Sequence, residues 1–208
     1  MEEMGIIPNT DAILVHDHWK AYYSYKNKTH ALCNEHHRRE LEYETESGIK
    51  WAEPMSELLL ETNKLTTESG GILGEEEQKR VRKKYRKILA AAEIECPPPP
   101  PKPDGKRGKV AKTKARNLLE RLRDFEDDVL RFMTNLKVPF TNNLAERDLR
   151  MNKVHQKISG CFRSIENANI FCRIRGYLST CAKNNVSATE ALNLLFHGSL
   201  PGFIDLGE

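Results

Sequence analysis

The chain has 208 residues, of which 38% are hydrophobic and 30% charged, a composition typical of one soluble globular domain that can carry an insertion. No apolar run approaches the roughly 20 residues that a membrane-spanning helix needs, and the N-terminus lacks the basic and apolar regions of a secretory signal. Five scattered cysteines without a CxxC pair favour a reduced, cytoplasmic protein.

The net charge of +3 is unevenly distributed along the chain. Residues 1–78 carry a net charge of −9, residues 79–123 carry +12, and residues 124–208 are balanced. A basic block of this size is a candidate phosphate-binding surface, because each cation placed near a phosphate releases condensed counterions. The alternative is a solvated charged helix followed by a basic linker. The cations singled out as phosphate contacts are Lys83, Lys84, Arg86 and Lys87.

Two short strands are predicted near the N-terminus. Residues 12–16 form an apolar run rich in β-branched residues that ends at Asp17. Residues 29–33 resemble a second strand, and Asn34 is a suitable N-cap for a helix over residues 35–46. Trp19, Tyr22 and Tyr23 have helical spacing and are expected to pack on the sheet.

The rest of the chain is predicted to be helical. Apolar spacing indicates a helix from Trp51 to Thr62, a charged helix over residues 75–95, and an amphipathic helix from Leu118 to Phe132. A proline-rich basic linker is expected near residues 96–112. A stripe from Ile170 to Cys181 predicts another helix, and a capping box from Ser187 to Glu190 opens the last one, which is expected to run through Leu195.

One candidate site residue lies in the segment after residue 138. Asn142 and Asn143 precede a predicted helix whose first turn contains Glu146. At about 100° per residue, the glutamate shares one helical stripe with three cations, and a second stripe on the opposite side is expected to face the core. The cations are Arg150, Lys153 and Lys157, and the core-facing stripe is Leu144, Met151 and Ile158. Alternatively, Glu146 and Arg150 form an ordinary exposed ion pair.

The other candidate site residue is Asp17. In open α/β sheets, ligands bind outside the carboxyl ends of the strands, so a carboxylate directly after a buried strand is placed for function. The alternative role is an N-cap for the segment that starts at His18. His16 and His18 are expected to be surface or packing residues. A zinc site at Cys33, His36 and His37 is disfavoured because no second pair of ligands accompanies them.

Several segments resemble the insertion-sequence-66 family of DDE transposases, and they follow the family's order along nearly the whole chain. They are His16–Tyr22, His30–Leu41, Trp51-Ala52, Leu58–Glu61, Asn142–Arg147 and Lys157–Ser164. The resemblance implies an RNase H-like α/β fold in which two aspartates and a glutamate hold two Mg²⁺ or Mn²⁺ ions. Asp17 matches the second acid and Glu146 the third, and the asparagines and the basic stripe are predicted to contact DNA. Such a site would suit in-line attack on a phosphodiester.

The sequence departs from the family pattern at two points. Thr141 stands where the family usually has aspartate, and only residues 1–16 precede Asp17, so the first catalytic aspartate has no match. We therefore expect an N-terminally truncated RNase H-like fold, mostly α-helical with two or three short strands. Its predicted parts are a truncated core over residues 1–47, a helical insertion over residues 48–138, and C-terminal helices over residues 139–208.

The resemblance implies metal-dependent DNA strand cleavage and strand transfer during transposition of an insertion sequence. With one acid unmatched, the lone chain is expected to be inactive. The alternative is a non-catalytic DNA-binding or regulatory fragment of a transposase, and a decayed reading frame is a third possibility. The expected partners are insertion-end DNA and either further copies of the chain or an intact transposase, in a prokaryotic, nucleoid-associated setting without a membrane.

Overall fold

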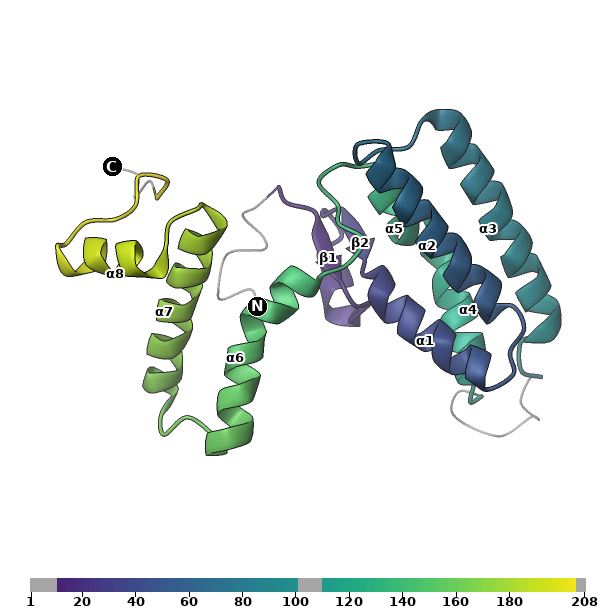
Figure 1. The fold of residues 1–208 in the computed structure, drawn as a ribbon. Helices are drawn as coiled ribbons and strands as arrows, with labels where there is room; N and C mark the ends of the chain where they lie inside the picture. Colours follow the sequence, from purple (N-terminus) through teal and green to yellow (C-terminus); the bar gives the residue numbers. More distant parts are fainter. Residues whose placement is uncertain (1–10, 101–109, 205–208) are drawn as a thin grey trace. The chain divides into compact units, whose positions relative to one another are not determined.

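A computed structural model describes residues 11–100 and 110–204 (Figure 1). Contacts divide the chain into two compact units, residues 1–142 and residues 143–208, and each is described by itself. Most described residues are helical, and two short strands form the sheet, as predicted. No helix in the described ranges is long and apolar enough to cross a membrane.

The first unit begins with a small parallel sheet. Strand β1 (Leu14–His16) pairs with strand β2 (His30–Leu32), with Leu14 opposite His30 and His16 opposite Leu32. A 3-10 helix, η2 (Lys20–Ser24), forms part of the connection between the two strands. Because the pairing is parallel, the carboxyl ends of both strands lie at the same edge of the sheet. The residues that follow His16 and those that follow Leu32 therefore lie at the same edge of the sheet.

Helices make up the rest of the first unit. They are α1 (Asn34–Glu46), α2 (Ala52–Glu68), α3 (Glu75–Glu95), α4 (Lys114–Asp124), α5 (Glu126–Leu130) and the 3-10 helix η3 (Arg131–Met133). Their apolar faces and strand β2 bury one continuous core. Tyr85 on α3 is fully buried, and its hydroxyl donates to the backbone oxygen of Leu122 on α4 over 2.9 Å. Helices far apart in the sequence are thereby joined around a common interior.

The predicted helix from Leu118 to Phe132 is wrong in one respect, because the structure divides it into three shorter elements. Phe125 has φ −119° and ψ 31°, outside the helical region, so α4 ends there and α5 begins. The change of direction places the Phe125 ring against His18, with the ring centroids 4.6 Å apart. The linker predicted near residues 96–112 lies largely outside the described residues.

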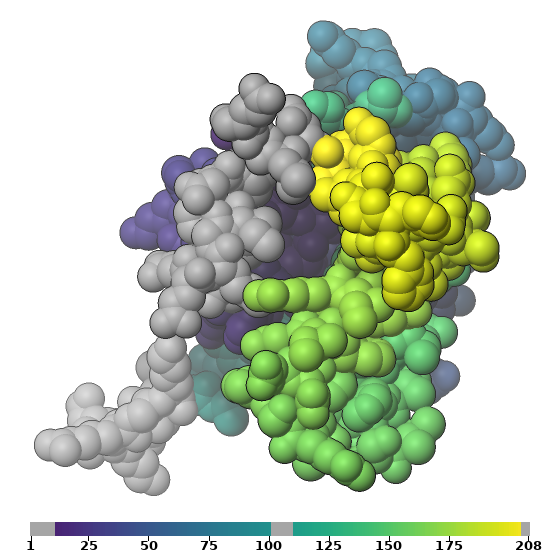
Figure 2. Space-filling view, turned by 90° about the vertical axis from the view of Figure 1, so that its left-hand side faces the viewer, coloured from purple at the N-terminus to yellow at the C-terminus, as the bar shows by residue number. Residues whose placement is uncertain are grey.

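The second unit contains helices α6 (Asn143–Ser159), α7 (Ile165–Lys183) and α8 (Ala188–Phe196). Ser187 caps α8 by accepting a hydrogen bond from the backbone N–H of Glu190 over 3.2 Å, which confirms the predicted start of this helix at the N-cap Ser187. Helix α8 packs against α7, and the Tyr177 hydroxyl donates to the Ala191 carbonyl over 2.8 Å. Figure 2 shows the unit from green to yellow in space-filling form.

The second unit buries few large apolar side chains. The stripe predicted to face the core of α6 is instead exposed: Leu144 is 60% exposed, Met151 42% and Ile158 79%. Within the described part of this unit, only small side chains such as Cys181 and Ala191 are fully buried among the hydrophobic residues. The prediction that this stripe faces the core is therefore wrong, because no helix of the described second unit covers it.

Candidate functional site

Asp17 is the first residue after β1 and is exposed at the carboxyl edge of the sheet. Its Oδ1 accepts a hydrogen bond from the backbone N–H of Trp19 over 3.3 Å, so the carboxylate also closes the turn that leads into η2. The Asp17 side chain is exposed to solvent. Asp17 is not the N-cap of the helical segment that follows, because η2 has Trp19 as its N-cap. The role of a ligand-binding carboxylate stays a prediction.

His16, the last residue of β1, is buried rather than superficial. Its Nε2 lies 3.1 Å from Nδ1 of His30, and its ring stacks on Tyr22 with centroids 4.8 Å apart. Burial, followed by the nearby His30, lowers the pKa of His16 from 6.5 to about 4. The imidazole is consequently neutral at physiological pH and serves as a packing residue, as one of the two sequence interpretations proposed.

The aromatic segment after Asp17 only partly behaves as predicted. Tyr22 and Tyr23 pack on His16, and the Tyr23 hydroxyl donates to Asp128 over 3.3 Å. Trp19 is 58% exposed, so its predicted packing against the sheet is wrong. Trp19 precedes η2 as its N-cap, with an extended backbone (φ −64°, ψ 122°), so it does not share the helical turn that carries Tyr22 and Tyr23.

The residues after β2 are buried and hold a second segment in place. Asn34 is the first residue of α1 and not its N-cap, which is Cys33. Its side-chain amide donates to the Val129 carbonyl over 2.9 Å, and its Oδ1 lies 3.3 Å from Nδ1 of His37. Asn34 therefore fastens α1 to α5, a long-range contact that a local capping rule cannot anticipate.

The residues considered for zinc do not form a metal site with other ligands. His37 is fully buried against Asn34, and burial lowers its pKa to about 3. Cys33 is also buried, and its Sγ accepts from the backbone N–H of Asn142 over 3.3 Å. Across the described ranges, no group of three His, Cys, Asp or Glu side chains is arranged to hold a metal ion.

Asn142 is brought to the carboxyl edge of the sheet within the first unit. Besides the Asn142–Cys33 bond, the backbone N–H of Asn34 donates to the Phe140 carbonyl over 3.0 Å. The Oδ1 of Asn142 is buried without a hydrogen-bond partner among the described residues. An amide oxygen and the Asp17 carboxylate are the hard oxygen donors that Mg²⁺ prefers, so the donor chemistry at this edge fits the metal that the resemblance implies.

Glu146 lies in the first turn of α6, in the second unit, and is half-buried. Arg150, Lys153 and Lys157 are exposed on the same helix, and Asn143 is its first residue. The neighbouring Asp148 accepts from the Ser179 hydroxyl over 2.6 Å and also pairs with Lys183, which joins α6 to α7. These contacts hold the pKa of Asp148 below its usual range. The helix that carries Glu146 is thus anchored within its own unit.

Much of the basic block is engaged by acidic side chains. Arg86 makes a two-point contact with Glu126 at 2.9 Å, and Arg82 binds the same carboxylate at 2.8 Å. Arg116 is buried, where it bonds Glu120 at 2.9 Å and also pairs with Glu93. The basic block of residues 79–123 therefore contains arginines that are paired with carboxylates and lysines that are exposed. The exposed lysines of the candidate set are Lys83, Lys84 and Lys87.

Comparison with known protein families assigns the chain to the DDE class of transposases. Residues 3–170 match the Transposase IS66 family, and the chain belongs to that family. No curated protein and no solved structure matches the chain.

Proposed function

We propose that this chain supplies two of the three catalytic carboxylates of an insertion-sequence transposase, Asp17 as the second acid and Glu146 as the third. The observation that carries the proposal is the position of Asp17, exposed directly after a strand of a parallel pair, within a chain that matches the family over residues 3–170. The strand pair β1–β2 would then be part of an RNase H-like sheet, and residues 48–138 its helical insertion.

DDE transposases typically use Mg²⁺, and Asp17 and Glu146 are the residues that would hold it here. When bound, the metal would activate the attacking oxygen and stabilise the leaving oxygen of a phosphodiester. The chain's own residues would position the substrate. Asn142 and Asn143 would lie beside the reacting strand, and the exposed stripe Arg150, Lys153 and Lys157 would neutralise DNA phosphates.

The proposed reaction is metal-dependent cleavage and joining of DNA at the ends of an insertion sequence. Because no residue of this sequence matches the first acid of the family, we propose that the 208 residues alone bind DNA without cleaving it. A third carboxylate would have to come from an additional polypeptide segment or from another chain. Homo-oligomers and complexes with an intact transposase are both compatible with that requirement.

Cleavage assays would test the proposal. Purified protein with Mn²⁺ and labelled insertion-end DNA should give binding and no product. The same chain, supplied with a segment that provides the third carboxylate, should cleave, and Asp17→Ala should abolish that activity. Asp11→Asn, an exposed carboxylate at the opposite end of the strand, is the matched control. Cleavage by the supplemented chain that survives Asp17→Ala would refute the assignment.

A further inference from the structure

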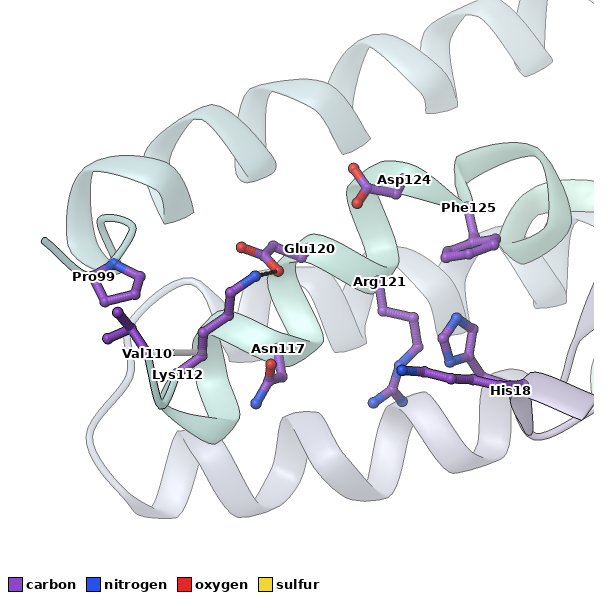
Figure 3. Close-up of a pocket in the computed structure, with 10 residues that line it drawn as sticks. His18, Pro99, Val110, Lys112, Asn117, Glu120, Arg121, Asp124 and Phe125 are labelled. Carbon is purple, nitrogen blue, oxygen red and sulfur yellow. Dashed lines mark hydrogen bonds and ion pairs between the residues drawn. The ribbon is translucent and has the colours of Figure 1, made fainter. Parts of the chain in front are cut away.

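A cavity of about 790 Å³ lies in the first unit, between the turn that follows Asp17 and helix α4. His18 and Lys20 line it from the turn, and α4 contributes Asn117 and Arg121 (Figure 3). The remaining wall includes Lys112 and Phe125. His18 directly follows Asp17 in the sequence, whereas Asp17 itself does not line the cavity.

Three cations and two carboxylates line the cavity, so its wall carries a net charge of +1. Both carboxylates have cationic partners: Glu120 pairs with Lys112, and Asp124 accepts from Arg123 over 2.8 Å. Arg121 shares its charge with Glu40, at 2.5 Å from Nη1. Lys20 is exposed and makes no ion pair with any described residue. An anion entering the cavity would therefore meet a cation that is not neutralised.

His18 has an unusual backbone conformation that places its ring in this wall. Its φ is +69°, in the left-handed region that side chains other than glycine rarely adopt and that is often retained at functional sites. The ring packs against Phe125 and Tyr23, with centroids 4.6 and 5.5 Å away. Its Nε2 is buried without a hydrogen-bond partner among the described residues.

The His18 imidazole lies next to a cationic residue of the cavity wall. Figure 3 shows the imidazole beside both Phe125 and Arg121. An anion in the cavity would be attracted by the unpaired ammonium group of Lys20. The imidazole and the Asn117 amide add hydrogen-bonding groups of the kind that phosphate oxygens accept from.

We propose that this cavity binds a phosphate of the DNA backbone, with Lys20 and Arg121 as the cations and His18 and Asn117 as the polar contacts. The assignment deepens the proposed function and rests on it for the choice of DNA as the ligand. The cavity would add DNA contacts from the turn after β1 and from α4 to those of the basic stripe on α6. The strand held here would be the one that approaches Asp17.

Two variants test the cavity through affinity for insertion-end DNA. Lys20→Ala removes the unpaired cation, and Asn117→Asp places a negative charge on the wall at an exposed helical position. Lys26→Ala is the matched control, because Lys26 is an exposed lysine of the same connection that does not line the cavity. Lys20→Ala should weaken binding about three- to tenfold and reduce the slope of log K against log salt by about 1. Asn117→Asp should weaken binding at least as much, and Lys26→Ala should leave it unchanged.

A second arm separates DNA from free phosphate. Inorganic phosphate is titrated into the protein while the imidazole resonances of His18 are followed by NMR, and the DNA titration is followed in the same way. We expect DNA to shift the His18 resonances at far lower concentration than phosphate. A shift by phosphate together with unchanged DNA affinity in Lys20→Ala would overturn the assignment to DNA.

The outcomes distinguish failure of the cavity from failure of the proposed function. Normal DNA binding by Lys20→Ala and Asn117→Asp would overturn the cavity and leave Asp17 and Glu146 unaffected. Absence of DNA binding by the unaltered protein would contradict the proposed function, and with it the cavity. Weakened binding in both variants, with Asp17→Asn still binding DNA normally, would support the cavity irrespective of the metal ligands.

Discussion

The backbone N–H of Asn142 donates to the Sγ of Cys33 over 3.3 Å and so joins two segments that lie 109 positions apart in the sequence. Cys33 directly follows β2, and Asp17 directly follows the parallel strand β1. Asn142, which directly precedes α6, therefore lies at the carboxyl edge of the sheet, where Asp17 follows β1. This relationship lies within the first unit.

Removing that sulfur should loosen the Asn142 segment. In Cys33→Ala the amide loses its acceptor, and we expect its hydrogen exchange to accelerate by roughly five- to tenfold, the equivalent of about 1 kcal/mol. Cys96→Ala, at another buried cysteine, is the control. Hydrogen exchange followed by NMR measures the effect, and unchanged protection at Asn142 would show that the sulfur contact does not hold the segment.

Acid should destabilise the first unit before its carboxylates titrate. His16 has a folded pKa of about 4 against 6.5 for the free side chain, and His37 one of about 3. Between pH 6.5 and these values the unfolded chain binds protons that the folded chain does not, so the free energy of unfolding falls as the pH is lowered. The slope should approach about 1.4 kcal/mol per pH unit for each such histidine.

Urea denaturation between pH 8 and pH 5 would measure this dependence. His16→Phe should reduce the slope below pH 6.5, whereas substitution of the exposed His197 by glutamine should not. Stability that is independent of pH over this range would contradict the buried, neutral state of His16.

The Tyr85 hydroxyl should contribute to the junction of α3 and α4. Tyr85→Phe leaves the ring in the core but removes the bond to the Leu122 carbonyl, which should cost about 1 kcal/mol in the free energy of unfolding. Tyr43→Phe removes a hydroxyl from a side chain that is 51% exposed and should change stability by less than about 0.5 kcal/mol. Equal effects of the two substitutions would argue against the buried hydrogen bond.

The basic block should separate into binding and structural cations. Replacing Lys83, Lys84 and Lys87 by glutamine should weaken DNA binding and lower its salt dependence by up to about 3 in slope, without loss of stability. Arg86→Gln should instead destabilise the protein, because it breaks the two-point contact with Glu126. Thermal unfolding and salt-dependent binding measure the two effects. DNA affinity that is unchanged by the triple substitution would remove these lysines from the proposed interface.

The hydrophobic periodicity and capping residues of the sequence predicted those helices and strands whose bounds depend on local sequence. The helix over residues 75–95 and the N-cap at Ser187 agree with the structure, and both strands are present with shorter bounds. Long-range packing decided the remaining elements. Asn34 was expected to cap a helix, but its amide reaches Val129, a contact that depends on how α1 and α5 meet. The exposure of Ile158 likewise depends on which helices cover α6, and a sequence period does not contain that information.

The sequence pattern made two carboxylates candidates for the site. Asp17 was a candidate because it follows an apolar strand and Glu146 because it opens a helix with a basic stripe, and the family resemblance then matched them to the second and third acids. The wall of the cavity at His18 was missed, since its residues come from two distant segments and a left-handed backbone turns the imidazole into it. The unusual run of polar and aromatic residues after Asp17 was the only local signal there.

Titration of Mn²⁺, followed by its effect on water proton relaxation, tests most directly whether Asp17 and Glu146 are metal ligands. The unaltered protein should bind Mn²⁺ weakly, and both Asp17→Asn and Glu146→Gln should reduce the affinity at least fivefold, while Asp11→Asn should not. If Asp17→Asn and Glu146→Gln bind Mn²⁺ as tightly as the unaltered protein and the Asp11→Asn control, the two carboxylates do not hold the metal. That result would contradict the proposed catalytic role of this chain.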